Sequence, residues 1–271
     1  MVLSPFNTRL RAEVERKQSR LCLGLDLDPS RSSRLHDATL DSLREASLAI
    51  VEETWDRVWG YKLNFAFFEQ FGAAGYAWLE ELAAAIGQRA MVIGDAKRGD
   101  IGNSARNYAR SIFQHLDLDA ATVNPYMGQD ALEPFLADPA RGAFVLCLTS
   151  NPGAEDFQRH GNDHPLYLEV AAWAQTLNDA DNLGLVVGAT HPDDLARVRQ
   201  AAPELPFLIP GVGAQGGALE PAVACGTPEC PSIINVSRGI LYAGEGSLDE
   251  ISAGVKDYNR RINKLAQSHG L

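Results

Sequence analysis

The sequence is poor in cysteine, which bears on both metal binding and compartment. Only four cysteines occur in 271 residues, namely Cys22, Cys147, Cys225 and Cys230. Four residues lie between Cys225 and Cys230, whereas two residues lie between the paired cysteines of common zinc sites. We therefore expect four free thiols, as is typical of a reducing compartment, and a cytoplasmic protein.

Positive charge and long apolar runs are also scarce. The chain has 24 Lys and Arg against 35 Asp and Glu, a net charge of -11. A sequence-independent nucleic-acid binder needs a basic face, so no nucleic-acid partner is expected. No apolar run reaches membrane-spanning length, and residues 1–20 are charged without the apolar core of a signal peptide. We expect no membrane partner, and an anionic substrate would need a local cluster of Lys and Arg.

Short apolar segments recur along the chain, with helical segments between them. The predicted strands are Leu21–Asp26, Trp59–Leu63, Ala90–Asp95, Ala121–Val123, Ala143–Thr149, Leu183–Gly188, Phe207–Pro210 and Ile233–Val236. Several are almost wholly apolar, as parallel strands buried on both faces must be. Between them, apolar residues repeat at helical spacing, for example at Leu43, Ala46 and Ile50.

This alternation predicts an α/β fold, a (β/α)₈ TIM barrel that forms a single domain over residues 1–271. The competing architecture is an open doubly wound sheet, in which the first strand leads into a Gly-x-Gly-x-x-Gly turn. Here the first strand leads into Gly24-Leu-Asp-Leu-Asp-Pro29, which cannot form that turn. The longest irregular stretch, Asn151–Pro165, is predicted to be a lid or binding loop. It contains His160 and His164, which are four apart but not on a recognisable helix, so no metal site is expected there.

Polar residues follow the C-terminal ends of the predicted strands. They are Asp26, Lys62, Asp95 with Lys97, Asn124, Ser150, Thr190, Gln215 and Arg238. In a barrel these ends face one mouth, where the active site is built. A charge at the end of an apolar strand is costly unless it is paired, so opposite charges at neighbouring ends indicate a network.

The densest group of charges is Gly94-Asp-Ala-Lys-Arg-Gly-Asp-Ile101. Asp95 and Lys97 are two residues apart, so both should point into the barrel. Asp100 lies beyond the strand and can be directed elsewhere. A lysine beside carboxylates is held protonated, and a protonated, positioned lysine is a general acid. A plain surface ion pair is disfavoured by the apolar run that precedes it.

Glycine-rich loops are predicted after the seventh and eighth strands, at Pro210–Gly217 and at Ser237-Arg-Gly239. Loops at these two places are the usual phosphate site of a barrel. Glycines let backbone N–H groups close on an anion, and Arg238 can bond it with two N–H groups. An ordinary glycine-rich turn remains the alternative for each loop taken alone.

The motif Asp95-Ala-Lys-Arg-Gly-Asp100 resembles the Asp-x-Lys-x-x-Asp signature of the orotidine 5′-phosphate decarboxylase family. Similar segments follow in order along nearly the whole chain: Cys22–Asp26, Tyr61–Glu69, Val123–Gly128, Thr149–Gly153, Pro210–Gly217 and Asn235–Tyr242. The single motif is shared with related sugar-phosphate enzymes, whereas the ordered combination is very specific. Together the segments look like the longer, mainly bacterial subgroup.

The resemblance implies a carboxy-lyase (EC 4.1.1.23) that converts orotidine 5′-phosphate to uridine monophosphate (UMP) and CO₂. It implies no cofactor and no metal, and a place as the last step of de novo UMP synthesis. Lys62, Asp95, Lys97 and Asp100 match the family's alternating charged tetrad. Lys97 would be the proton donor to C6 of the pyrimidine, and Asp95 would sit against the scissile carboxylate.

The same resemblance assigns the binding contacts. Asp26 and Lys62 would contact the ribose, Ser150 the pyrimidine edge, and Gln215 and Arg238 the phosphate. Asp100 would reach the ribose of the neighbouring subunit's substrate, with Ile101 and Ser104 nearby. The resemblance therefore implies a homodimer with shared active sites.

Two other functions stay open on the residues. The first is a sugar-phosphate decarboxylase or aldolase-type relative on the same barrel, which would typically use magnesium. The second is a pyrimidine-nucleotide-binding sensor, against which a complete set of charged residues argues, because a sensor needs no proton donor. A turnover assay with and without a chelator separates these three functions.

Overall fold

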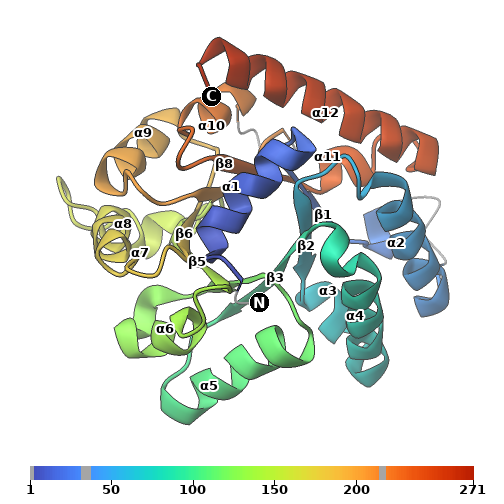
Figure 1. Ribbon diagram of the computed structural model, residues 1–271, viewed down its shortest axis with the longest axis horizontal. Coiled ribbons are helices and arrows are strands. Elements are labelled where there is room, and N and C mark those ends of the chain that lie inside the picture. Colours follow the sequence, from blue (N-terminus) through green and yellow to red (C-terminus); the bar gives the residue numbers. More distant parts are fainter. Residues whose placement is uncertain (1–2, 32–37, 214–217) are drawn as a thin grey trace.

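The computed structural model describes residues 3–31, 38–213 and 218–271. Parallel strands form a closed barrel in chain order, surrounded by helices (Figure 1). The strands are β1 (Leu21–Gly24), β2 (Gly60–Asn64), β3 (Met91–Arg98), β4 (Ala120–Val123), β5 (Gly142–Leu148), β6 (Leu183–Val187), β7 (Phe207–Ile209) and β8 (Ser232–Val236). Because β8 pairs back with β1 in parallel, the predicted (β/α)₈ barrel is confirmed and the open sheet is excluded.

The helices form the outer layer of the barrel. The α-helices are α1 (Phe6–Lys17), α2 (Leu40–Thr54), α3 (Ala66–Glu69), α4 (Gly72–Ile86), α5 (Gly102–Arg110), α6 (Gln129–Leu136), α7 (Ala154–Phe157), α8 (Leu166–Thr176), α9 (Pro192–Ala201), α10 (Leu219–Ala224), α11 (Arg238–Leu241) and α12 (Leu248–Ser268). Short 3₁₀ turns lie at η1 (Pro29–Arg31), η2 (Gly87–Arg89) and η4 (Pro125–Met127), and a π-helical turn at η3 (Ser111–His115) follows α5. Among the helices of the described ranges, none has both the length and the apolarity that crossing a membrane requires.

Each predicted strand is present, with ends that differ by at most three residues. The largest differences are in β3, which continues to Arg98, and in β1, which already ends at Gly24. β3 is longer because it pairs with β4 a second time, after a shift of register, with Arg98 opposite Val123. The predicted loop over 151–165 contains one short helix, α7.

Alternate residues of a strand serve two separate cores. In β1, Leu21 and Leu23 pack in the layer between strands and helices, whereas Cys22 packs inside the barrel. All three side chains are fully buried. This double burial is the reason that the strands read as continuous apolar runs and not as alternating ones.

Helix α1 was not predicted from the sequence, and it closes one end of the barrel. Its Phe6, Leu10 and Val14 join the interior core, and the helix crosses the barrel in Figure 1. It lies at the start of the strands, since Phe6 occupies the space that a side chain at Gly142, the first residue of β5, would fill. The N-terminal end of the barrel is thereby sealed, and the opposite end carries the site.

Candidate active site

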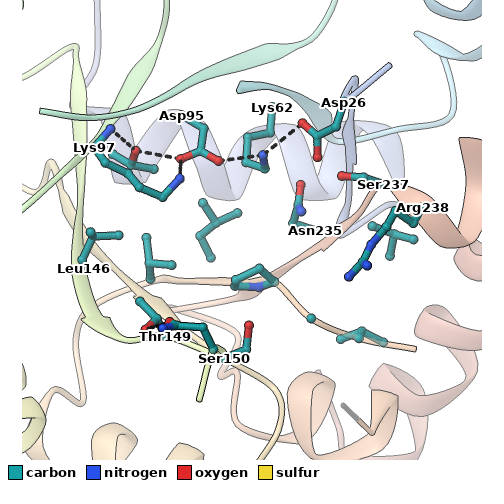
Figure 2. A pocket seen from close by; sticks show the side chains of 18 of the residues that line it. Asp26, Lys62, Asp95, Lys97, Leu146, Thr149, Ser150, Asn235, Ser237 and Arg238 are labelled. Atoms are coloured by element: carbon teal, nitrogen blue, oxygen red, sulfur yellow. Dashed lines mark hydrogen bonds and ion pairs between the residues drawn. The ribbon is translucent and has the colours of Figure 1, made fainter. Parts of the chain in front are cut away.

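The C-terminal ends of the strands surround a cavity of about 340 Å³. Its lining includes six of the predicted site residues, Asp26, Lys62, Asp95, Lys97, Ser150 and Arg238. Figure 2 shows a row of charged side chains along one side of the cavity, Arg238 at one end, and Thr149 with Ser150 across from the row. The fold therefore brings these six residues together at one end of the barrel, as predicted.

The charged row alternates in sign from β1 to β3. Lys62 Nζ lies 2.7 Å from Asp95 Oδ2 and 3.5 Å from Asp26 Oδ1. Lys97 Nζ lies 2.5 Å from the other oxygen of Asp95. Lys62 and Asp95 are only 5% and 8% exposed, whereas the side chain of Lys97 is 50% exposed. The inner pair is thus a buried ion pair at the wall of the cavity, and Lys97 is the most exposed member of the row (Figure 2).

The neighbouring charges fix the protonation of the inner pair. Burial alone would lower the pKa of Lys62, but the carboxylates of Asp26 and Asp95 outweigh burial and raise it above its ordinary value. Burial alone would raise the pKa of Asp95, but the Lys62 and Lys97 cations outweigh it and lower this pKa far below the usual range. Asp95 is therefore a carboxylate, and Lys62 an ammonium, at any pH near neutrality. The depressed pKa of Asp95 means that its contribution to stability is lost only when the pH falls through acidic values.

The backbone at Lys97 is irregular. The β3–β4 register shifts between Gly94 and Arg98, and Lys97 has φ +47°, in the left-handed region that lysine rarely occupies. The Lys97 N–H donates to Thr122 Oγ1 at 2.9 Å, and the Thr122 hydroxyl donates to Asp95 Oδ1 at 3.0 Å. The lysine does face the cavity as predicted, but a strained turn braced by β4 places it there, and not simple strand alternation.

The end of β5 is held by a side chain from the 151–165 segment. The Thr149 N–H donates to Gln158 Oε1 at 2.7 Å, and Gln158 Nε2 donates to Thr149 Oγ1 at 2.8 Å. The next residue, Arg159, pairs with Asp194 of α9. This segment therefore braces Thr149, which lies next to Ser150 in the lining of the cavity.

A cation stands at the other end of the cavity. Arg238 begins α11, directly after β8, and points into the cavity (Figure 2). No hydrogen bond or ion pair joins its guanidinium group to another described residue. Beside it, the turn after β7 has Gly211 at φ +91° and Gly213 at φ +75°, conformations that glycine adopts readily. A guanidinium group next to a glycine turn is suited to an anion. The predicted partner Gln215 lies outside the described residues.

Three predicted site residues lie outside this cavity. Asp100 accepts a hydrogen bond from the N–H of Ile101 at 2.8 Å, just before α5. Ile101 is 52% exposed, and Ser104 is exposed on the first turn of α5. None of the three belongs to the lining of the cavity in the described chain.

Five polar residues of the lining were not among the predicted site residues, namely Thr122, Thr149, Asn151, Asn235 and Ser237, and the bracing Gln158 was not predicted either. Thr122 is a β-branched residue in a strand, which is ordinary there, and Gln158 lies in an irregular polar stretch. Asn235 did carry a signal, since it is the one amide in the run Ile233-Ile-Asn-Val236. In the described ranges, no group of three or more His, Cys, Asp and Glu is placed to hold a metal ion.

Comparison with known proteins points to one family. The model of the family described as Orotidine 5′-phosphate decarboxylase / HUMPS matches residues 19–248. A Roseiflexus sp. (strain RS-1) protein named orotidine 5′-phosphate decarboxylase is 48% identical over 247 residues, covering 89% of this chain and 90% of the relative. A protein of the same name from Thermomicrobium roseum is 45% identical over 270 residues, covering 96% of both.

The fold is similar to that of a solved relative over almost its whole length. The structure of Leishmania donovani OMP decarboxylase is 40% identical, with a TM-score of 0.85, covering 97% of this chain and 98% of the other. The residues that the family model matches include the strand ends that carry the charged row. The chain belongs to the orotidine 5′-phosphate decarboxylase / HUMPS family.

Proposed function

We propose that this chain is a carboxy-lyase that converts orotidine 5′-phosphate to UMP and CO₂ without a cofactor. The observation that carries the proposal is the half-exposed ammonium group of Lys97, held 2.5 Å from the buried carboxylate of Asp95 at the open end of the barrel. Named relatives at 44–49% identity support the same reaction.

The reaction needs a cation and a proton at one carbon atom. Loss of CO₂ from the pyrimidine leaves the electron pair of the broken bond on C6, and a proton must replace the carboxylate there. Lys97 is the group to stabilise this negative charge and to donate the proton, because its ammonium faces the cavity. Asp95 holds Lys97 in place and lies against the departing carboxylate, while Lys62 balances the charge of Asp95 from the buried side.

The substrate spans the cavity in three parts. We assign the phosphate to Arg238, the pyrimidine edge to Ser150, and the ribose to Asp26 and Lys62 between them. Contacts to the phosphate and ribose are remote from the reacting carbon atom. Their binding energy can therefore orient that carbon atom and drive closure of the 151–165 segment over the site.

An Arg238→Ala variant is expected to bind UMP far more weakly than the unchanged protein, and uridine almost equally. A charge-assisted contact of this kind is worth ~1.5–3 kcal/mol, or on the order of 10- to 150-fold in affinity. Titration calorimetry with both ligands measures the difference. Arg260→Ala is the matched control, since Arg260 lies on α12 with a side chain that is 77% exposed. If the variant binds UMP and uridine more weakly by the same factor, Arg238 does not contact the phosphate.

The proposal includes a cytoplasmic homodimer that catalyses the last step of de novo UMP synthesis. The four cysteines are free thiols, which suits a reducing compartment. Ile101 and Tyr108 are exposed at the start of α5 and on it, and Tyr126 and Met127 are exposed in η4, just before α6, which packs against α5. Exposed apolar side chains suit an interface, and Ile101 adjoins Asp100, the residue that we assign to the partner's site.

The test of the proposed reaction is the loss of orotidine 5′-phosphate absorbance on addition of the protein, with and without EDTA. We expect the same rate in both samples. Turnover that EDTA abolishes would favour the magnesium-dependent sugar-phosphate reaction. Binding of UMP with no turnover of orotidine 5′-phosphate would favour a nucleotide sensor.

A further inference from the structure

The side-chain amide of Asn235 is a buried polar group that the roles above leave unused. Asn235 lies on β8, lines the cavity and is only 7% exposed. Its Oδ1 atom is buried and has no hydrogen-bond partner in the described part of the chain. Most buried polar side-chain atoms have a hydrogen-bond partner, so a ligand in this cavity is one source of the partner that Oδ1 lacks.

Packing does not explain why this position is polar. Strand alternation puts Ile234 and Val236 in the outer core and Ile233 in the barrel interior. Asn235 is the next residue of β8 that points into the barrel, closer to the C-terminal ends of the strands. An apolar residue would fill the same space. On the neighbouring strand, a Cβ at Gly24 would lie 1.9 Å from Ser237 Oγ and 3.3 Å from Asn235 Oδ1, so the bare backbone there leaves room for both polar side chains.

The place of Asn235 in the cavity identifies the part of the ligand that it faces. In Figure 2 the amide lies between Lys97 at one end and Arg238 at the other, on the side of Lys62 and Asp26. A nucleoside 5′-phosphate with its phosphate at Arg238 and its reacting carbon atom at Lys97 must place its sugar between them. In this arrangement the sugar would lie over Asn235.

The chemistry of the two groups also matches. Asp26 Oδ1 is likewise buried without a hydrogen bond, and its contact with Lys62 is an ion pair at 3.5 Å. A sugar hydroxyl both donates and accepts hydrogen bonds, and so does a carboxamide. The hydroxyls of one ribose can thus bond to both the Asn235 amide on β8 and the Asp26 carboxylate, which follows the adjacent strand β1.

We propose that Asn235 is a further substrate-binding residue, which hydrogen-bonds to a ribose hydroxyl and makes the site selective for ribonucleotides over a deoxyribonucleotide. This inference rests on the proposed function, because it takes the ligand to be a pyrimidine ribonucleoside 5′-phosphate.

The test combines the N235L variant with three ligands, UMP, 2′-deoxy-UMP and 3′-deoxy-UMP, and measures each Kd by titration calorimetry. We expect N235L to bind UMP roughly 10-fold more weakly than the unchanged protein does. For the analogue that lacks the partner hydroxyl, the two proteins should bind with the same affinity, because the interaction is already absent. Without ligand, N235L should unfold at the same or a higher temperature, since leucine removes an unmatched buried amide.

Other outcomes would overturn the inference. Equal weakening for all three ligands, or for none, would mean that Asn235 does not touch a ribose hydroxyl. Lower stability without ligand, together with equal weakening, would mean a structural role. If N235L does not fold, N235A must give the same pattern. Turnover by the unchanged protein distinguishes the two proposals. If the Kd values follow the expected pattern but the protein does not decarboxylate orotidine 5′-phosphate, only the proposed reaction is wrong. If turnover is normal but the Kd values do not follow the pattern, only the proposed role of Asn235 is wrong.

Discussion

Replacing Lys97 by alanine is expected to abolish turnover of orotidine 5′-phosphate and to leave a folded barrel. The ammonium group of Lys97 is the more exposed cation of the charged row, so its loss removes both the proton donor and the positive charge nearest to the reacting carbon atom. Loss of a general acid costs ~10²–10⁴-fold in rate, and more when the group also stabilises charge in the transition state. Single-turnover measurements of UMP formation report this loss directly.

The fold should tolerate this change. The Lys97 side chain is half exposed, and an ion pair with so exposed a member adds at most about 1 kcal/mol to stability. Asp95 keeps its bonds to Lys62 and Thr122 in the variant. Lys264→Ala, at an exposed position on α12, is the matched control for both rate and thermal unfolding. A Lys97→Ala protein with near-normal turnover would end the proton-donor assignment.

A mixture of two inactive variants is expected to regain activity if the sites are shared. Lys97→Ala and Asp100→Ala are unfolded and refolded together in equal amounts. Random pairing makes about half of the dimers mixed, and each mixed dimer contains one site with neither lesion. About a quarter of all sites are then intact, so activity should return to roughly a quarter of that of the unchanged protein. The physical reason is that Asp100 lies outside the cavity of its own chain and turns its carboxylate toward the start of α5.

A second mixture provides the negative control. Lys97 and Asp95 bond to each other within one chain, so Lys97→Ala refolded with Asp95→Asn should stay inactive, because every site carries a lesion. An affinity tag on one variant verifies that mixed dimers form. If mixed dimers form and the Lys97→Ala and Asp100→Ala mixture also stays inactive, Asp100 acts within its own chain and the shared-site proposal is wrong.

The sequence by itself predicted the architecture and the charged part of the site. Strands buried on both faces must be apolar throughout, so each strand could be predicted as a short apolar segment. Closure of the barrel followed from the number and order of these segments. Charged residues at the ends of such runs need partners. This requirement identifies Lys62, Asp95 and Lys97 as a paired group from the sequence alone.

Only the tertiary structure decided the features that depend on contacts between distant residues. Half of the residues of helix α1 are charged, and its role comes from Phe6 and Leu10 filling the end of the barrel. The left-handed backbone of Lys97 is stable because Thr122 on the next strand accepts its N–H. The role of Gln158 depends on its hydrogen bonds to Thr149 at the end of β5, and the role of Asn235 depends on what occupies the cavity. Local pattern reports burial and periodicity, whereas a hydrogen bond between side chains far apart in the chain exists only after the barrel has closed.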